Sequence, residues 1–166
     1  MATSTSEISL NSKPNTAARP GARVSLRMWS DMTSFSDVRQ HIALLPHIVA
    51  SKGDVRKDLK GAPLNSRFGR NYVSFEESEL NNASELQPFV ENILQAVASS
   101  EYAHLIRAKD VEATLWTAVF RQDFAYQGAI GESVIAQASH IGVRLFIEDY
   151  TRLDDDGVPK KIWLNE

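Results

Sequence analysis

Four segments of this chain alternate between two kinds of side chain, and this alternation constrains the fold more than any other feature. They are residues 24–29, 71–76, 111–120 and 143–150. In each, aliphatic residues recur at every second position, which is the pattern of a strand that buries one face. The side chains between them are aromatic or charged: Arg27, Trp29, Tyr72, Trp116, Phe120, Arg144, Phe146 and Tyr150. We therefore expect a sheet with one aliphatic face and one aromatic face.

Three helical patterns lie between these strands. Residues 35–45 carry an apolar stripe that ends at Pro46, and residues 86–97 carry a wider stripe with Ser84 and Gln87 at capping positions. A third pattern covers about residues 129–140 and is followed by Gly142, which suits a C-cap. This order predicts an α+β fold with a four-stranded, mainly antiparallel sheet, helices on one face, and a ferredoxin-like variant of topology.

The length of 166 residues is typical of one domain with a full-size core. We expect residues 23–166 to form a single α+β domain. Residues 1–22 are rich in Ser, Thr, Asn, Pro and Ala, a composition that predicts a flexible N-terminal tail. The alternative is an arm that folds onto the aromatic face.

Composition excludes several classes of protein. The net charge of −3 argues against direct nucleic-acid binding, which usually requires a basic surface. The chain has no cysteine, so disulfides, thiolate nucleophiles and cysteine zinc sites are excluded. No apolar run reaches membrane-spanning length. We expect a cytoplasmic protein without membrane contact.

Motifs for common catalytic chemistry are missing from the sequence. There is no P-loop, no Gly-x-Ser-x-Gly elbow and no dinucleotide fingerprint. The four histidines, His41, His47, His104 and His140, lack the spacing of metal ligands. We therefore predict a protein that is not an enzyme and needs neither a cofactor nor a metal.

Two kinds of charged segment stand out. Residues 46–70 show no regular period and predict a long loop, with a short strand at residues 47–50 as the alternative. Within this stretch, residues 52–70 hold six basic and two acidic residues, a local net charge of +4. This basic loop suits a clamp for a phosphate or another acidic ligand. Two acidic clusters lie in predicted turns, Glu76, Glu77 and Glu79 in one and Asp154, Asp155 and Asp156 in the other.

An aromatic sheet face indicates a binding surface. RNA-recognition sheets have this geometry, but the aromatic-rich motif of such modules is not found here. Aromatic residues with arginine also dominate the energy of protein interfaces. We predict that a protein partner binds Trp29, Tyr72, Trp116, Phe120 and Phe146, with the two acidic clusters as steering charges. Coverage by the chain itself, or by a homodimer, would bury the same residues.

Several segments together resemble a known family. They are residues 24–29, the helix that ends in Leu44-Leu45-Pro46, the Lys52-Gly53-Asp54 loop, and residues 138–147 followed by Tyr150. This order is similar to the bacterial family called domain of unknown function 4279, and the resemblance covers most of residues 23–150. The family often has Trp in the second strand, where this chain has Tyr72 and Phe75. The resemblance implies no catalytic residue.

Small acidic bacterial α+β proteins of this kind are similar to immunity proteins, which bind and neutralise a toxin. Toxins that attack nucleic acids are usually basic, so an acidic inhibitor gains on-rate and specificity from complementary charge. We therefore predict a cytoplasmic immunity protein that binds a basic toxin domain. The alternative is a small-molecule or nucleotide sensor that uses the basic loop at residues 52–70.

Overall fold

The computed structural model describes residues 20–58, 60–75 and 77–165. Within these residues, seven strands form the main sheet in the order β2-β5-β1-β7-β8-β9, with β6 also paired to β1. The strands are β1 (Ala22–Ser30), β2 (Pro46–Ala50), β5 (Asn71–Phe75), β6 (Ser78–Leu80), β7 (Glu112–Val119), β8 (Val143–Leu153) and β9 (Pro159–Trp163). Neighbouring strands are antiparallel, except that β7 and β8 are parallel.

The prediction of a four-stranded, ferredoxin-like sheet is wrong, because the main sheet has seven strands among the described residues. The four predicted strands form the contiguous centre β5-β1-β7-β8. The additional strands β2, β6 and β9 have three to five residues each, and most of these residues are exposed or half-buried. Short, half-solvated strands lack the alternation that marks the central ones, so their pairing depends on tertiary context.

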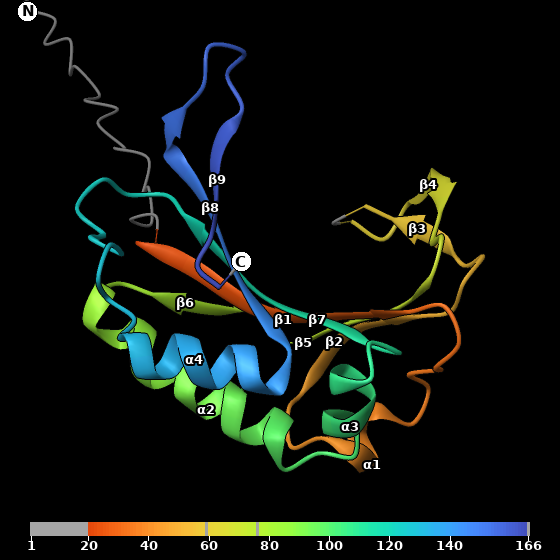
Figure 1. Cartoon of the computed structure of the whole chain (residues 1–166). Helices are drawn as coiled ribbons and strands as arrows, with labels where there is room; N and C mark the ends of the chain where they lie inside the picture. Colours follow the sequence, from red (N-terminus) through yellow and green to blue (C-terminus); the bar gives the residue numbers. More distant parts are fainter. Residues whose placement is uncertain (1–19, 59, 76, 166) are drawn as a thin grey trace, which may run out of the picture.

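The helices cover one face of the sheet, as Figure 1 shows below the strands. They are α1 (Val38–His41), a 3₁₀ turn at Ala83–Glu85, α2 (Leu86–Ala98), α3 (Tyr102–Arg107) and α4 (Glu132–Ile141). The wide apolar stripe of α2 is confirmed, since its residues Leu86, Val90, Leu94 and Val97 are fully buried against the sheet's aliphatic face. This layer is the hydrophobic core.

The caps of the helices explain where they begin and end. The capping box before α2 consists of Asn82 and Glu85, and not of Ser84 and Gln87. Gln87 instead accepts a hydrogen bond from the backbone N–H of Gly131, 2.9 Å away. At the end of α4, Gly142 is confirmed as the C-cap, with a φ of 90° that strains any residue with a Cβ atom.

Helix α1 is a single turn, whereas the apolar stripe predicts a helix to Leu45. Phe35, Val38 and Ile42 are buried as that stripe requires, but Leu45 is 58% exposed. The chain becomes extended at Ile42 and then enters β2 at Pro46. Proline disfavours a helical conformation in the residue before it, and pairing with β5 supplies the hydrogen bonds that a longer helix would have made.

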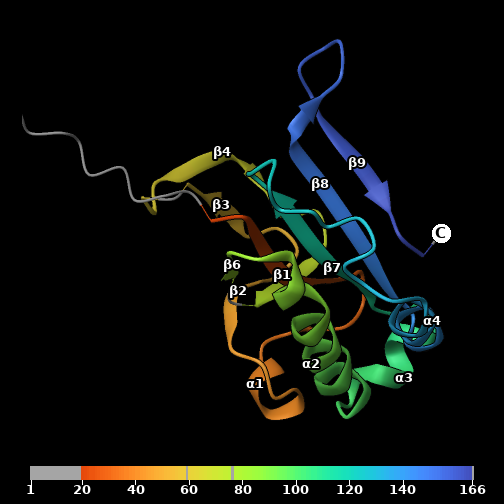
Figure 2. The ribbon, with the colours of Figure 1, turned by 90° about the vertical axis from the view of Figure 1, so that its left-hand side faces the viewer.

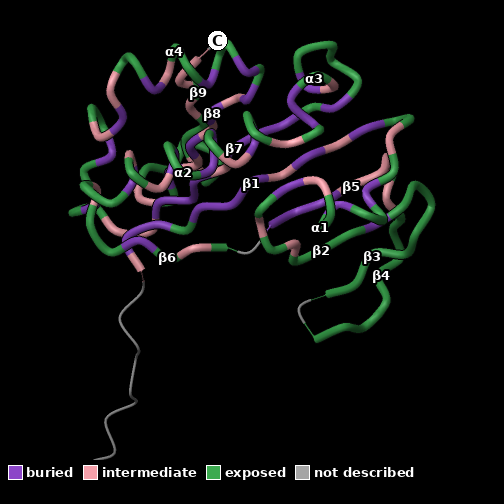
Figure 3. The backbone as a smooth tube through the Cα atoms, turned by 90° about the horizontal axis from the view of Figure 1, so that it is seen from below, coloured by how far each residue is buried: buried purple, intermediate pink, exposed green. Residues whose placement is uncertain are grey.

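The prediction of an irregular loop at residues 46–70 is also wrong in part, because this stretch contains strands. After β2, the strands β3 (Val55–Lys57) and β4 (Pro63–Arg67) pair as a separate two-stranded hairpin, which we call the basic hairpin. The Asp58 carboxylate accepts hydrogen bonds from the backbone N–H groups of Lys60 and Ala62, each at 2.8 Å, and thereby fixes the turn. In Figure 3 the residues of β3 and β4 are coloured as exposed.

The opposite edge of the sheet ends in a second hairpin, formed by β8 and β9. Strand β8 pairs with β7 only as far as Asp149 but continues to Leu153. The hairpin therefore extends about 13 Å beyond the sheet, at a rise of about 3.3 Å per residue. In Figure 2 both hairpins rise on the side of the sheet that the helices leave uncovered.

The predicted N-terminal tail at residues 1–22 lies mostly outside the described residues. Strand β1 already begins at Ala22, one residue before the predicted domain boundary. Among the helices that the structure describes, none combines the length and apolar character needed to cross a membrane.

Candidate protein-binding face

The side of the sheet opposite the helices carries the residues that the alternation pattern singles out. We call it the open face. Strand register places its side chains in rows across neighbouring strands: Tyr72 and Trp29 with Glu112; Ser74 and Arg27 with Thr114 and Arg144; Ser25 with Trp116, Phe146 and Trp163; Arg23 with Ala118, Glu148 and Lys161. Phe120 follows β7 and stacks on Tyr150, with ring centroids 5.3 Å apart.

Trp116 occupies the middle of the open face. It lies on β7, the fourth of six strands in the main order, and is the fifth of eight residues in that strand. The Arg27 guanidinium covers its ring at 3.8 Å from the centroid, close enough for a strong cation–π contact. Arg27 also donates a hydrogen bond to the Ser25 hydroxyl at 3.3 Å. The centre of the face is therefore a fixed aromatic–arginine pair.

Aromatic rings beside this centre pack on one another. The ring centroids of Phe146 and Trp163 are 4.4 Å apart, and Arg144 lies over Trp163 at 4.9 Å. On the other side Trp29 contacts Tyr72 at 5.6 Å. Rings whose faces are already occupied by neighbours are poor platforms for stacking a nucleic-acid base, but they offer edges and polar groups to a protein surface.

The base of the basic hairpin contacts the aromatic rings of the open face. Phe68, which follows β4, stacks on Tyr72 with centroids 5.4 Å apart and nearly parallel rings, and Arg56 lies over Phe68 at 5.0 Å. The hairpin is thus fixed to the rim of the open face through a chain of contacts that runs from Arg56 to Trp29. Sequence reasoning missed Phe68, because it lies in a stretch without alternation.

Exposure distinguishes the open face from the core. The five predicted anchors, Trp29, Tyr72, Trp116, Phe120 and Phe146, are all half-buried. Tyr150 and Trp163 are 43% and 37% exposed. Between the rings, the small side chains Ser25, Ser74, Thr114 and Ala118 are buried. The described residues therefore leave the rings partly accessible, as binding to a partner requires.

The first predicted acidic cluster is paired with arginines of the open face. Glu79 accepts hydrogen bonds from Arg23 at 2.9 and 3.1 Å, and Glu77 lies 3.8 Å from Arg27. Glu76 lies outside the described residues. Glu77 and Glu79 neutralise the arginines of the face, and this local pairing reduces the long-range steering that we expect of them.

The second acidic cluster lies at the turn between β8 and β9. Asp154 accepts hydrogen bonds from the backbone N–H groups of Asp156 and Val158, at 3.0 and 2.8 Å, and so fixes the turn. Asp155 and Asp156 are exposed. We call Asp154, Asp155 and Asp156 the acidic tip. It lies far from the basic hairpin, at the other edge of the sheet.

Trp163 and the face arginines were missed as site residues by sequence reasoning. The sequence does carry a local signal for Trp163, because this residue stands in an apolar run with Ile162 and Leu164, and β9 runs through it. Its register opposite Phe146, which places it on the open face, follows only from the β8–β9 turn. All three tryptophans of the chain, Trp29, Trp116 and Trp163, therefore lie on this one face.

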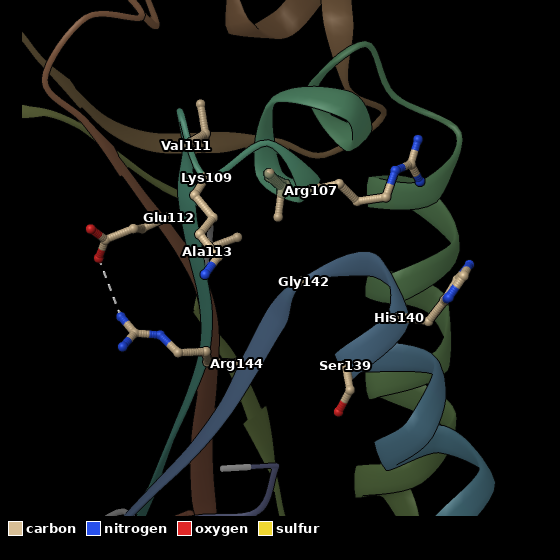
Figure 4. A pocket seen from close by; sticks show the side chains of 10 residues that line it. Arg107, Lys109, Val111, Glu112, Ala113, Ser139, His140, Gly142 and Arg144 are labelled. Carbon is tan, nitrogen blue, oxygen red and sulfur yellow. Dashed lines mark hydrogen bonds and ion pairs between the residues drawn. The ribbon is translucent and has the colours of Figure 1, made fainter.

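A cavity of about 550 Å³ lies between the ends of α3, α4 and β7. Figure 4 shows Arg107 and His140 pointing away from Glu112, which pairs with Arg144 at 3.4 Å. Arg107 and His140 occupy the last turns of α3 and α4, where cations interact favourably with the helix dipole. The helix ends thus account for Arg107 and His140, and the ion pair with Glu112 accounts for Arg144.

One buried carboxylate lies outside the open face. Asp149 on β8 is 1% exposed and accepts hydrogen bonds from the Tyr126 hydroxyl at 3.0 Å and from the Thr151 hydroxyl and backbone N–H at 2.6 and 2.9 Å. Burial raises the pKa of Asp149, but the hydrogen bonds from Thr151 and Tyr126 lower it more, so that the pKa lies below its ordinary value. Burial and the contact with Asp149 raise the pKa of Tyr126.

This network has a structural role. Tyr126 belongs to the connection between β7 and α4, and its bond to Asp149 holds that connection against the end of β8. Within the described residues, no group of three or more His, Asp or Glu side chains is arranged to hold a metal ion.

Comparisons with known proteins provide no relative. No family model matches the chain, and neither the curated proteins nor the solved structures give a match. The resemblance to domain of unknown function 4279 stays a prediction. The function is therefore argued from the geometry of the open face.

Proposed function

We propose that this protein is a binding module that docks another protein on its open face. The observation that supports this most is the position of the five anchors. Four come from β1, β5, β7 and β8, and Phe120 follows β7, yet all lie on the side that the helices leave uncovered. A contiguous, half-exposed aromatic surface with arginines at its centre has the composition of a protein-interface core.

The shape of the surface supports the same proposal. The basic hairpin and the β8–β9 hairpin rise at the two edges of the sheet, so the open face is the floor between two raised rims (Figure 1). Its side chains are held in place by ring–ring and ring–arginine contacts. Preorganised anchors lose little conformational freedom on binding, which favours affinity.

The toxin-neutralising role belongs to the same proposal. The acidic tip is the feature that suits a basic toxin domain, since Glu77 and Glu79 are engaged by arginines. A partner that stops cell growth when expressed alone, and that no longer does so when co-expressed with this chain, would establish this role. A partner that is harmless on its own would limit the function to binding.

The alternative of a small-ligand sensor has less support. The described part of the basic hairpin is exposed throughout, which is the geometry of a rim. Arg70, the last basic residue of the predicted loop, is engaged by Asp31 and Glu112 at 3.1 and 2.9 Å. We therefore assign the hairpin to the protein-binding surface.

Affinity capture with the full chain tests the proposal. Wild type, Trp116→Ala and Phe89→Ala are immobilised and exposed to a lysate of the native host. Phe89 is a half-buried aromatic on α2, so Phe89→Ala is a matched control on the helix-covered side. Trp116→Ala should weaken the captured complex by more than about 2 kcal/mol, while Phe89→Ala retains it. Equal capture by a folded Trp116→Ala variant would show that the open face is not the interface.

A further inference from the structure

The two hairpins occupy diagonally opposite corners of the open face. The basic hairpin connects β2 to β5 at one edge, beyond the row that contains Tyr72 and Trp29. The β8–β9 hairpin forms the other edge and projects beyond Val119, at the far end of β7. Figures 1 and 2 show both rising on the same side of the sheet.

These corners carry opposite charge. The basic hairpin has Arg56, Lys57, Lys60 and Arg67 against Asp58, a net charge of +3. The acidic tip contributes three aspartates. The basic residues nearer the base of the β8–β9 hairpin have acidic neighbours: Arg152 lies 3.6 Å from Asp149, Lys160 lies opposite Asp149, and Lys161 lies opposite Glu148. The acidic charge therefore dominates at the projecting tip.

We infer that the partner of the open face is a second copy of this chain, in a two-fold symmetric dimer. This inference rests on the proposed function, whose partner it names. A half-turn about an axis in the plane of the face, perpendicular to the diagonal, exchanges the two corners. Each basic hairpin then meets the acidic tip of the other copy, and the two Trp116 side chains lie near the axis. Such an interface is self-complementary, as two-fold symmetry requires.

The same two-fold arrangement also brings exposed aliphatic side chains of one copy's hairpin against those of the other copy's hairpin. The basic hairpin exposes Val55 and Leu64, at 37% and 45%, and the β8–β9 hairpin exposes Leu153 and Val158, at 60% and 41%. Exposed aliphatic residues on two projecting hairpins have few neighbours within one chain. In the dimer, the aliphatic residues of one hairpin face those of the other beside the paired charges.

The open face supplies most of the area that a stable dimer buries on each partner. Five inter-strand spacings of about 4.8 Å and eight residues at about 3.3 Å give a floor of about 24 by 26 Å, or roughly 600 Å². The hairpins add to this floor. Stable interfaces bury about 800 Å² per partner. A foreign protein that uses the open face has to displace the second copy.

Charge reversal tests the arrangement in the full chain. In the first variant, Lys57→Glu with Lys60→Glu makes both corners acidic; in the second, Asp155→Lys with Asp156→Lys makes both corners basic. Sedimentation velocity should show a dimer for wild type and monomers for each variant alone. An equimolar mixture should restore the dimer, because both corner contacts then join opposite charges. The dimer should weaken as salt is added.

Cysteine cross-linking tests the orientation, and the absence of native cysteine makes it specific. Lys57→Cys and Asp155→Cys variants are prepared separately and treated with a short bismaleimide. The mixture should give a cross-linked dimer in high yield, whereas each variant alone should give little. High yield for either variant alone, or none for the mixture, would overturn the proposed arrangement.

The outcomes separate this inference from the proposed function. A wild-type chain that stays monomeric from dilute to concentrated solution overturns the second copy as partner, and Trp116-dependent capture of a foreign protein would then leave the proposed function standing. A dimer that forms but is unaffected by Trp116→Ala also overturns the inference. Support requires that Trp116→Ala raise the dimer dissociation constant by about thirtyfold or more.

Discussion

Leu115 and Trp116 are neighbours on β7, but they lie on opposite faces of the sheet and in different surroundings. Leu115 is 1% exposed and packs in the aliphatic core beneath the helices. Trp116 is half-buried and packs against the Arg27 guanidinium. Burial of a leucine side chain stabilises the fold by about 1.5–3 kcal/mol, whereas an exposed cation–π contact contributes about 0.5–1 kcal/mol.

The comparison shows that the two faces of one sheet are built differently. The helix-covered face supplies the stability of the fold, because its side chains lose their water completely. The open face holds its rings in place through side-chain contacts but leaves part of each ring accessible. Substitutions on the covered face should therefore reduce stability, and those on the open face should mainly reduce binding.

The largest difference is expected between Leu115→Ala and Trp116→Ala. Leu115→Ala should lower the free energy of unfolding by about 2–5 kcal/mol, because it leaves a cavity in the core. Trp116→Ala should lower it by less, because part of the ring is already exposed to water in the folded protein and only its buried part and the cation–π contact are lost. Urea unfolding followed by circular dichroism measures both. Equal losses would mean that the two faces are equally buried.

Asp149→Ala should lower the free energy of unfolding by about 2–3 kcal/mol, since it leaves the Tyr126 and Thr151 hydroxyls without their acceptor. Urea unfolding at neutral pH measures the loss. Phe120→Ala, on the open face nearby, is the matched comparison and should cost less. If Phe120→Ala costs more, the polar network contributes little to stability.

The Asp149 carboxylate also makes the free energy of unfolding depend on pH. The pKa of Asp149 in the folded protein lies below its ordinary value of 3.8. Its contribution is therefore complete above about pH 4 and is lost as the pH falls through the lowered pKa. The difference in unfolding free energy between wild type and Asp149→Asn should shrink below pH 3.8. Urea unfolding from pH 7 to pH 3 tests this, and a difference that grows towards acid would contradict the direction of the shift.

Gly142→Ala should lower the free energy of unfolding by about 1–2 kcal/mol, because a Cβ atom is unfavourable in the left-handed conformation. The added atom would also lie 3.1 Å from Ile106 Cγ2. Thermal unfolding compares it with Gly157→Ala, which has a similar φ of 76° but open space around it. The excess loss at Gly142 measures the packing of α3 against the end of α4.

The smallest effect, and the opposite sign, is expected for Thr114→Val on the open face. The Thr114 hydroxyl is buried and has no hydrogen-bond partner among the described residues. Valine has the same shape without the polar group, so the variant should be neutral or more stable by up to about 1 kcal/mol. Destabilisation in urea would show that the hydroxyl is hydrogen-bonded in solution.

Much of the centre of the fold could be predicted from the sequence. The strands around Leu115 and Leu145 bury aliphatic side chains at every second position, and α2 buries its residues at helical spacing. These patterns arise from burial of one face, which local sequence records directly. The same alternation placed the five anchors on the opposite face, because side chains in a strand point alternately to its two sides.

The periphery could not be predicted in the same way. Strands β3 and β4 are exposed on both sides, so no alternation marks them, and their only local signal was the turn at Asp58 and Gly61. Likewise, the pairing of Glu79 with Arg23 depends on β6 lying beside β1, which joins residues 56 positions apart. Contacts set by register between distant strands are not recorded in local sequence.

The most direct measurement uses the tryptophans, all three of which lie on the open face. Acrylamide quenching of their fluorescence is compared between the free chain and the chain saturated with its bound partner, whether a foreign protein or a second copy. We expect the quenching constant to fall on binding, because the partner covers the rings. A constant that does not change while the complex forms would show that the partner binds elsewhere.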